Sequence, residues 1–321
     1  MNLNKKLLSG SLILMIYFNV YNALNFVFHI IMARLLSTSD YGILATLFSI
    51  IYALSIFSES IQTILVKYTT EESDKGKIKN ILYRSLKRAF VISSIIFVLY
   101  AILSIPMSSF LKISYLLLLF NGLMVFGAFI LPVTRGILQG RKKFFSLGNN
   151  LLIETGIKLL LASTFVFIGF NVFGAMIGTF IGVFTAFALS FISLREVIFS
   201  KEKKALTEGI YAYSKPTFFA LTILLVFYSF DIILAKIYFN PELAGAYALA
   251  SILAKTIFFG TQPISKAMFP LSAEKNNTKK QSDDIFKSAL TLLLGAISLA
   301  LLPLARRISR TFSSVKGMLP M

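Results

Sequence analysis

Long apolar runs alternate with short polar segments along the whole chain. An α-helix rises about 1.5 Å per residue, so about 20 apolar residues cross a hydrocarbon layer about 30 Å thick. The runs that reach or approach this length are Leu7–Ala33, Gly42–Val66, Ala89–Met107, Ile113–Thr134, Leu151–Phe170, Val172–Leu194, Pro216–Phe239, Gly245–Leu271 and Ile285–Leu304. The pattern therefore predicts an all-α fold, a polytopic membrane helix bundle with about nine transmembrane helices.

Lysine and arginine residues are concentrated in alternate polar segments. The segments that hold Lys5–Lys6 and residues 67–88, 135–143, 195–215 and 275–280 contain 21 basic residues, whereas the opposite loops between the predicted helices contain only Arg34, Lys112 and Lys236. Basic segments stay on the cytoplasmic side of a membrane, so the pattern predicts a multi-pass protein of the cell membrane with a cytoplasmic N-terminus. The net charge of +18 is then a signal of orientation and not of nucleic-acid binding.

Composition supports a membrane protein and limits its chemistry. Hydrophobic residues make up 56% of the chain and charged residues only 14%, against about 25% charged residues in soluble domains. The chain has no cysteine and a single histidine, which excludes disulfides, thiolate chemistry and a histidine-rich metal site. The basic segment Gly76–Arg88 has helical periodicity, and we predict that it is an interfacial helix against anionic headgroups; a plain basic connector is the alternative.

One pattern occurs twice along the chain. Residues Ala33–Ile51 read ARLLSTSDYGILATLFSII and residues Ala235–Leu253 read AKIYFNPELAGAYALASIL, which align if one residue is inserted before the glycine. Each copy has a basic residue, an acidic turn, a glycine and a nearby tyrosine between two apolar runs. A repeat of this length is typical of the two halves of a membrane transporter.

The repeat predicts the domain organisation. Helices 1–3 correspond to helices 7–9, and the even offset of six helices makes this a parallel repeat. We expect a first six-helix bundle at 1–204, an incomplete second bundle of helices 7–9 at 205–304 and an atypical basic tail at 305–321. Counterparts of helices 4–6 do not follow residue 304. A non-functional truncated paralogue is therefore an alternative to a working transporter.

Several of these segments resemble a known family. The segments that carry the resemblance are ARLLSTSDYGILATLFSI, RGILQGRKKF, DIILAKIYFNPELAGAYALAS and QPISKAMFP. They are similar to segments of the polysaccharide-biosynthesis membrane proteins. These are the Wzx-like lipid-linked oligosaccharide flippases of the multidrug/oligosaccharidyl-lipid/polysaccharide (MOP) exporter superfamily. The resemblance implies two six-helix bundles around a central cavity that opens alternately to either face. It implies a polyprenyl-pyrophosphate-linked oligosaccharide as substrate.

Charged residues inside the predicted helices are candidates for function, because a charge at the bilayer centre costs about 2.5–3.5 kcal/mol. Lys255 is expected near the midplane, with Asp231 within reach on the preceding helix; this lysine either lines a water-filled cavity or forms a structural ion pair with Asp231. Glu154 and Lys158 are an i,i+4 pair on one helix and are predicted to satisfy each other, although Lys158 is deep enough to face the cavity.

Helix 1 carries a polar stripe at helical spacing, which meets either the cavity or hydrogen-bonding partners on other helices. Its members are Asn19, Asn22, Asn25 and His29. Glu59 near the inner end of helix 2 is likewise either cavity wall or interface. Asp231, Glu59, Glu154 and His29 are the candidates for coupling or ion pairing.

The sequence favours a transporter over an enzyme. It contains no phosphate-binding P-loop and no carboxylate cluster, so no catalytic residue, metal or cofactor is predicted. A membrane glycosyltransferase or polymerase would need a large outer loop, which the chain lacks. A drug/cation antiporter of the same superfamily remains the alternative transporter, and its cavity should be dominated by carboxylates.

The expected substrate and partners define the site. A pyrophosphate linker requires fixed cations, and the candidates are Arg34 at the outer mouth, Lys255 near the midplane and Lys158 toward the cytoplasm, with Asn19, Asn22 and Asn25 as further cavity residues. The predicted partners are the lipid-linked saccharide, the bilayer, and glycosyltransferases or a polymerase of the same pathway; no nucleic acid is expected.

Overall fold

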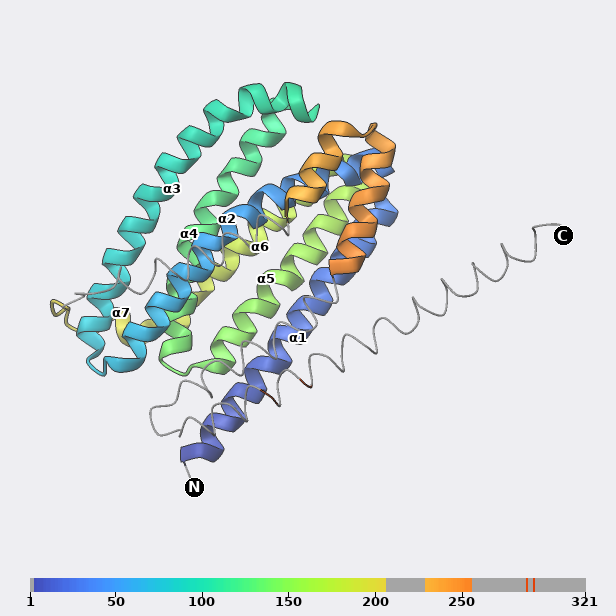
Figure 1. The fold of residues 1–321 in the computed structure, drawn as a ribbon. Coiled ribbons are helices and arrows are strands. Elements are labelled where there is room, and N and C mark those ends of the chain that lie inside the picture. Colours follow the sequence, from blue (N-terminus) through green and yellow to red (C-terminus); the bar gives the residue numbers. More distant parts are fainter. Residues whose placement is uncertain (1–2, 206–228, 256–286, 288–290, 292–321) are drawn as a thin grey trace. The chain divides into compact units, whose positions relative to one another are not determined.

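The computed structural model describes residues 3–205, 229–255, 287 and 291 (Figure 1). The chain divides into two compact units. One consists of residues 1–22 and 253–321, and the other of residues 23–252. The second unit contains most of the described helices.

Every described element is a helix. The main helices are α1 (Leu3–Leu35), α2 (Thr38–Glu71), α3 (Lys75–Leu111), α4 (Tyr115–Gly140), α5 (Phe144–Phe165) and α6 (Asn171–Ser193), with the short η1 (Val166–Phe170) and α7 (Arg195–Ile198). Residues 229–238 and 241–255 form two more helices. The all-α membrane fold is thus confirmed, and six of the nine predicted runs coincide with α1–α6. The run Ile285–Leu304 lies outside the described residues except for 287 and 291, which are both helical.

The segment Gly76–Arg88 is helical, as the sequence predicts, and its contact with headgroups stays a prediction. These residues form the beginning of α3, which continues without a break through Leu111. The helix contains 37 residues and is about 55 Å long, which is more than a bilayer core requires. Its first turns therefore project beyond the hydrocarbon layer while its later part crosses it.

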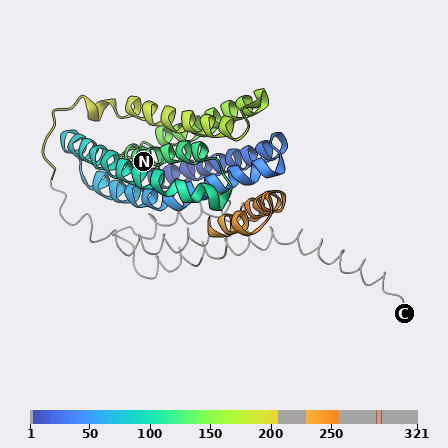
Figure 2. The same cartoon turned by 90° about the horizontal axis from the view of Figure 1, so that it is seen from above.

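Local signals explain where the helices begin and end. The hydroxyl of Ser37 accepts a hydrogen bond from the Asp40 amide and caps α2, and Asp74 caps α3 through the Gly76 amide. Gly169 has a φ of 98°, in the left-handed region that glycine adopts without a steric penalty. That turn reverses the chain, so α5 and α6 lie side by side as an antiparallel pair (Figures 1 and 2).

Helix α4 packs against both α2 and α3. The side-chain amide of the buried Asn121 donates to the Leu47 carbonyl on α2 and to the Tyr100 hydroxyl on α3. A Cβ at Gly136 would lie 2.8 Å from the Leu65 Cβ, so the glycine allows the two backbones to approach closely. Small residues and interhelical hydrogen bonds are the usual determinants of helix packing in lipid.

The α5–α6 pair depends on glycines in the same way. Gly174, Gly178 and Gly182 of α6 are spaced at i,i+4 and face α5. A Cβ at Gly182 would lie 2.7 Å from the Glu154 carbonyl oxygen and 3.2 Å from the Lys158 Cβ. The glycine therefore lets α6 lie directly against the part of α5 that carries Glu154 and Lys158.

A buried ion pair joins α4 to the α5–α6 pair. The guanidinium of Arg135 contacts the Glu154 carboxylate at 2.5 Å, and its Nε donates to the Asn150 side-chain oxygen at 2.8 Å. The Asn150 amide in turn donates to the Ala186 carbonyl on α6. The side chains of Arg135 and Glu154 are only 10% and 12% exposed. A charge left alone at this depth would have little water to solvate it.

We expect Gly182→Ala to destabilise the protein by about 1–3 kcal/mol, because the new methyl group meets backbone atoms of α5 that cannot move independently. Gly156→Ala on α5 is the matched control, since a Cβ there meets nothing within 4 Å and alanine has the higher helix propensity. Unfolding by SDS titration measures both. Equal stability of the two variants would contradict the close approach.

We expect Glu154→Gln to lower the free energy of unfolding by about 3–5 kcal/mol, because it leaves the Arg135 charge buried without a carboxylate. The double replacement Arg135→Leu with Glu154→Leu should recover most of that loss. Lys75→Gln is the control: its pair with Glu196 is about half exposed (48% and 54%), so solvent screens it and its loss should change the free energy of unfolding far less. A Glu154→Gln variant as stable as Lys75→Gln would show that the buried pair is unimportant.

Candidate functional site

The most unusual charge in the described bundle is Lys158. It lies on α5 with 7% of its surface exposed, and its ammonium donates a hydrogen bond to the side-chain oxygen of Asn25 on α1. The same nitrogen lies 4.4 Å from the ring centroid of Phe28 and 5.7 Å from that of Phe48. We call Asn25, Phe28, Phe48 and Lys158 the Lys158 cluster.

The predicted i,i+4 pair of Glu154 with Lys158 is replaced by two separate arrangements. Glu154 pairs with Arg135 across the α4–α5 interface, and Lys158 turns to α1. Among the described residues, the Asn25 oxygen is the single hydrogen-bond acceptor for an ammonium that carries three N–H donors. The cluster thus holds a positive charge against aromatic faces and one amide, with donors left for a further acceptor.

The aromatic side of the cluster extends to His29. This histidine is buried at 8% exposure, and its Nδ1 lies 3.4 Å from the Tyr41 hydroxyl. Its ring packs edge-on against Phe28 and Phe48 at centroid distances of 5.4 and 5.8 Å. Asn25 and His29 therefore share the polar face of α1 that the sequence predicts. In the other unit, Asn19 is exposed and donates to the Met15 carbonyl, and Asn22 is half-buried.

The second copy of the repeat has a comparable arrangement. Asp231 occupies the position that aligns with His29, and it also contacts a tyrosine of the following helix: the Tyr247 hydroxyl lies 3.4 Å from its carboxylate. Ser251 donates to the same carboxylate at 2.6 Å. Lys255, half-buried on the same helix as Tyr247, belongs to the other unit, and its role stays a prediction.

The remaining predicted residues lie apart from the cluster. Arg34 is exposed in the last turn of α1, where a cation also interacts favourably with the helix dipole. Glu59 is half-buried on α2. One turn further, the Gln62 amide donates to the Gln139 oxygen on α4 at 2.8 Å, so this part of α2 forms a helix interface.

The two copies of the repeat meet at their glycines. A Cβ on Gly42 would lie 2.9 Å from the Gly245 Cα, so the first turns of α2 and of the helix 241–255 are in direct backbone contact. The helix starts also correspond, because Ser37 caps the first and the Asn240 side-chain oxygen accepts from the Leu243 amide in the second. The caps align when the extra residue of the second copy precedes Asn240.

Arg135 and Asn150 are functional candidates that the sequence did not reveal. The predicted fourth helix ends at Thr134, which places Arg135 in a basic cytoplasmic segment, whereas α4 continues through Gly140 and buries it. The apolar residues Ile137 and Leu138 after it were the available signal. Among the described residues, no group of three His, Cys, Asp or Glu side chains could hold a metal ion.

Comparisons with known proteins give the family and the fold. Residues 31–309 match the family model "Polysaccharide biosynthesis protein". No curated protein sequence matches the chain. Similar solved structures include the MATE multidrug transporter DinF-BH, with a TM-score of 0.73, 16% identity and coverage of 97% of this chain and 75% of that chain.

Two further structures share the fold. A MOP superfamily transporter from Pyrococcus furiosus, described as having a binding pocket of reverse polarity that suggests a different function, gives a TM-score of 0.64 at 15% identity over 95% of this chain and 73% of that one. The eukaryotic MATE transporter AtDTX14 gives 0.63 at 14% identity over 89% and 70%. Five candidate membrane spans lie in the described residues. The chain is a multi-pass membrane protein with the fold of these transporters, and it belongs to the polysaccharide biosynthesis protein family.

Proposed function

We propose that this protein is a flippase that moves a polyprenyl-pyrophosphate-linked oligosaccharide from the cytoplasmic to the outer leaflet by alternating access. The observation that carries the proposal is the Lys158 cluster, a buried cation inside a transporter fold. A buried charge without a carboxylate partner is costly to retain in lipid. Such a cation is useful where an anion must pass.

The chemistry of the cluster suits a phosphate group. Lysine acts as a mobile point charge with three donors, and a phosphate oxygen is a stronger acceptor than the Asn25 amide oxygen. An incoming pyrophosphate would therefore replace Asn25 and restore full hydrogen bonding. Glu154 does not compete for Lys158, because Arg135 already binds its carboxylate.

Two other cations extend the path in this proposal. Arg34 at the end of α1 is exposed and would contact the pyrophosphate at the outer mouth, and Lys255 would contact it near the midplane. With Lys158, they are the cations that we propose as phosphate contacts. Asn19, Asn22 and Asn25 would provide polar contacts along α1, and Asp231, Glu59, Glu154 and His29 are the candidates for ion pairing or coupling.

The glycine contact between the repeats supports a closed outer face. The charge distribution predicts that the α1–α2 turn lies outside, so Gly42 and Gly245 would close the cavity on that side. Two backbones in contact without intervening side chains can separate without disrupting packed side chains. Alternating access would then require this contact to open when the substrate leaves.

The alternative is a drug/cation antiporter, favoured by the fold shared with multidrug transporters such as DinF-BH. A cationic substrate needs a carboxylate in the cavity. In the first bundle as described, the buried carboxylate of Glu154 is neutralised by Arg135, whereas Lys158 forms no ion pair with a described carboxylate. The electrostatics of the described bundle therefore favour an anionic substrate.

The flippase proposal also sets location and partners. We place the protein in the cell membrane with a cytoplasmic N-terminus, on the basis of the basic segments. Its substrate would come from glycosyltransferases of the same pathway, and a polymerase on the outer side could receive the product.

We expect Lys158→Ala to reduce glycan export at least tenfold, because the neutral cluster no longer attracts pyrophosphate, while Lys158→Arg retains part of it. Export is measured in cells that lack their own flippase, with protein levels held equal. Lys204→Ala, an exposed cation on a cytoplasmic segment, is the control and should export normally. Normal export by Lys158→Ala would remove the residue from the mechanism. Extrusion of a cationic dye that persists in Lys158→Ala would instead support the antiporter.

We expect Gly42→Ala to favour the outward-open state, because a methyl group prevents contact with Gly245. The chain has no cysteine, so a single Ala248→Cys provides a probe: Ala248 is fully buried one turn after Gly245. Labelling by an impermeant maleimide should increase several-fold when Gly42→Ala is added. Ala246→Cys, an exposed position on the same helix, should label equally in both backgrounds. Unchanged labelling of Ala248→Cys would show that the glycines are not a gate.

A further inference from the structure

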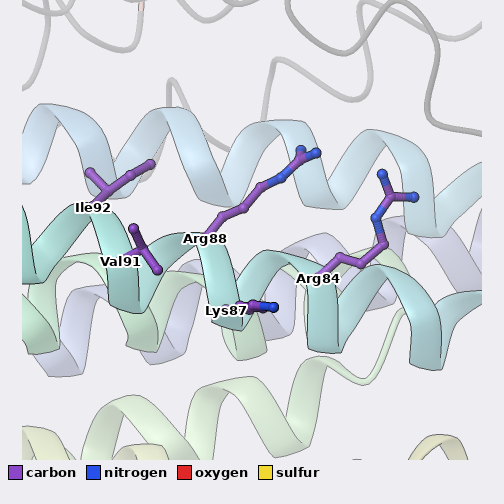
Figure 3. A pocket seen from close by; sticks show the side chains of 5 residues that line it. All are labelled: Arg84, Lys87, Arg88, Val91 and Ile92. Atoms are coloured by element: carbon purple, nitrogen blue, oxygen red, sulfur yellow. The ribbon is translucent and has the colours of Figure 1, made fainter.

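We infer that the basic end of α3 is a binding site for the phosphate headgroup of an anionic phospholipid, formed by Arg84, Lys87 and Arg88. These side chains line a hollow of about 380 Å³ together with Val91 and Ile92 (Figure 3). The inference concerns lipids of the surrounding membrane and does not rest on the proposed function.

The depth of the site follows from the exposed surface of α3. From Phe90 to Phe110 the helix contains no charged residue, and ten of its large apolar side chains in this stretch are exposed. Twenty residues of helix span about 30 Å, which matches the hydrocarbon core. The boundary with the headgroups therefore lies near Phe90. Arg88 is about 3 Å, Lys87 about 4.5 Å and Arg84 about 9 Å beyond it along the helix axis, which is the depth of lipid phosphates.

The side chains form two rows along the helix. Arg84, Arg88 and Ile92 follow one another at i,i+4 and rise on one side of α3, and Lys87 and Val91 form a second pair (Figure 3). Each row thus leads from a cation to an exposed aliphatic residue, with Val91 49% and Ile92 45% exposed. That order matches a phospholipid, in which the phosphate is followed by acyl chains.

The nearby carboxylates are already bound elsewhere. Glu72 pairs with Lys77, Asp74 with Lys203 and Glu196 with Lys75, and Glu202 accepts from the Asn80 amide. The Lys203 hydrogen bond lowers the pKa of Asp74, and the Lys75 hydrogen bond lowers the pKa of Glu196, so both carboxylates stay ionised and paired at neutral pH. These four carboxylates therefore do not pair with Arg84, Lys87 or Arg88.

One guanidinium of the site is already oriented. Arg84 donates through Nη1 to the Ala205 carbonyl at 3.3 Å, which positions the side chain while its other donors remain for a ligand. Arginine binds phosphate bidentately and lysine adds a point charge. A phosphodiester between these side chains would have acceptors for both kinds of donor.

The test uses the full-length chain, fused to a fluorescent protein, in neutral detergent without any glycan substrate. Phosphatidylglycerol should raise the midpoint of thermal unfolding in a saturable manner, because a ligand of the native state stabilises it. Phosphatidylcholine and inorganic phosphate should not. The combined variant Arg84→Gln, Lys87→Gln and Arg88→Gln should lose most of the rise, and Lys87→Gln alone should require several-fold more lipid. The control Arg195→Gln, Lys201→Gln and Lys204→Gln removes the same charge from exposed positions and should respond as the parent does.

Three results would overturn the inference. The first is a full response of the Lys87→Gln and triple variants. The second is an equal loss in the control triple, which would indicate attraction by net charge alone. The third is an equal shift with inorganic phosphate, which would indicate an anion site without a lipid. None of these results depends on glycan transport, so they leave the flippase proposal unaffected.

Discussion

The close approach of α5 and α6 at the glycines of α6 is the constraint on which the charged centre of the bundle depends. In lipid, helices gain little by hiding apolar side chains from the solvent, so tight backbone contact and interhelical hydrogen bonds must hold them together. Gly178 and Gly182 bring α6 against the part of α5 that carries Glu154 and Lys158. One turn of separation along α5 then sends Glu154 to α4 and Lys158 to α1.

Close backbone contact at glycines also occurs where the two copies of the repeat meet. Gly42 and Gly245 occupy equivalent positions in the two copies, and a contact between equivalent residues is what a two-fold relation between the copies produces. The polar residues His29 and Asp231 also align, and each contacts a tyrosine of the following helix. The sequences diverged in the chemistry of this position while they kept a polar contact there. The two copies therefore place side chains of different charge at one position of the repeat.

Apolar run length predicted the helices of the first bundle well, because the bilayer imposes that length on any spanning segment. It failed at the helix ends. Arg135 lies beyond the apolar run, but α4 continues past it, since Asn150 and Glu154 provide the partners that make its burial tolerable. The partners come from another helix, so no local pattern around Arg135 reveals them. The beginning of α3 shows the same limit: basic residues mark the membrane boundary, but they do not decide whether the helix bends there or continues into the water.

The distribution of charge inside the bundle bears on function. A buried arginine with its carboxylate is neutral as a pair and can be retained for packing alone, but a buried lysine whose described polar acceptor is an amide carries a net charge into the membrane. Replacing Lys158 by leucine would remove that cost and keep the contacts with Phe28 and Phe48. The charge of Lys158 therefore adds a cost that packing against these two rings does not require. An anion that enters the bundle is the partner that gives this charge a purpose, and in this family the anion we propose is the phosphate that links lipid to glycan.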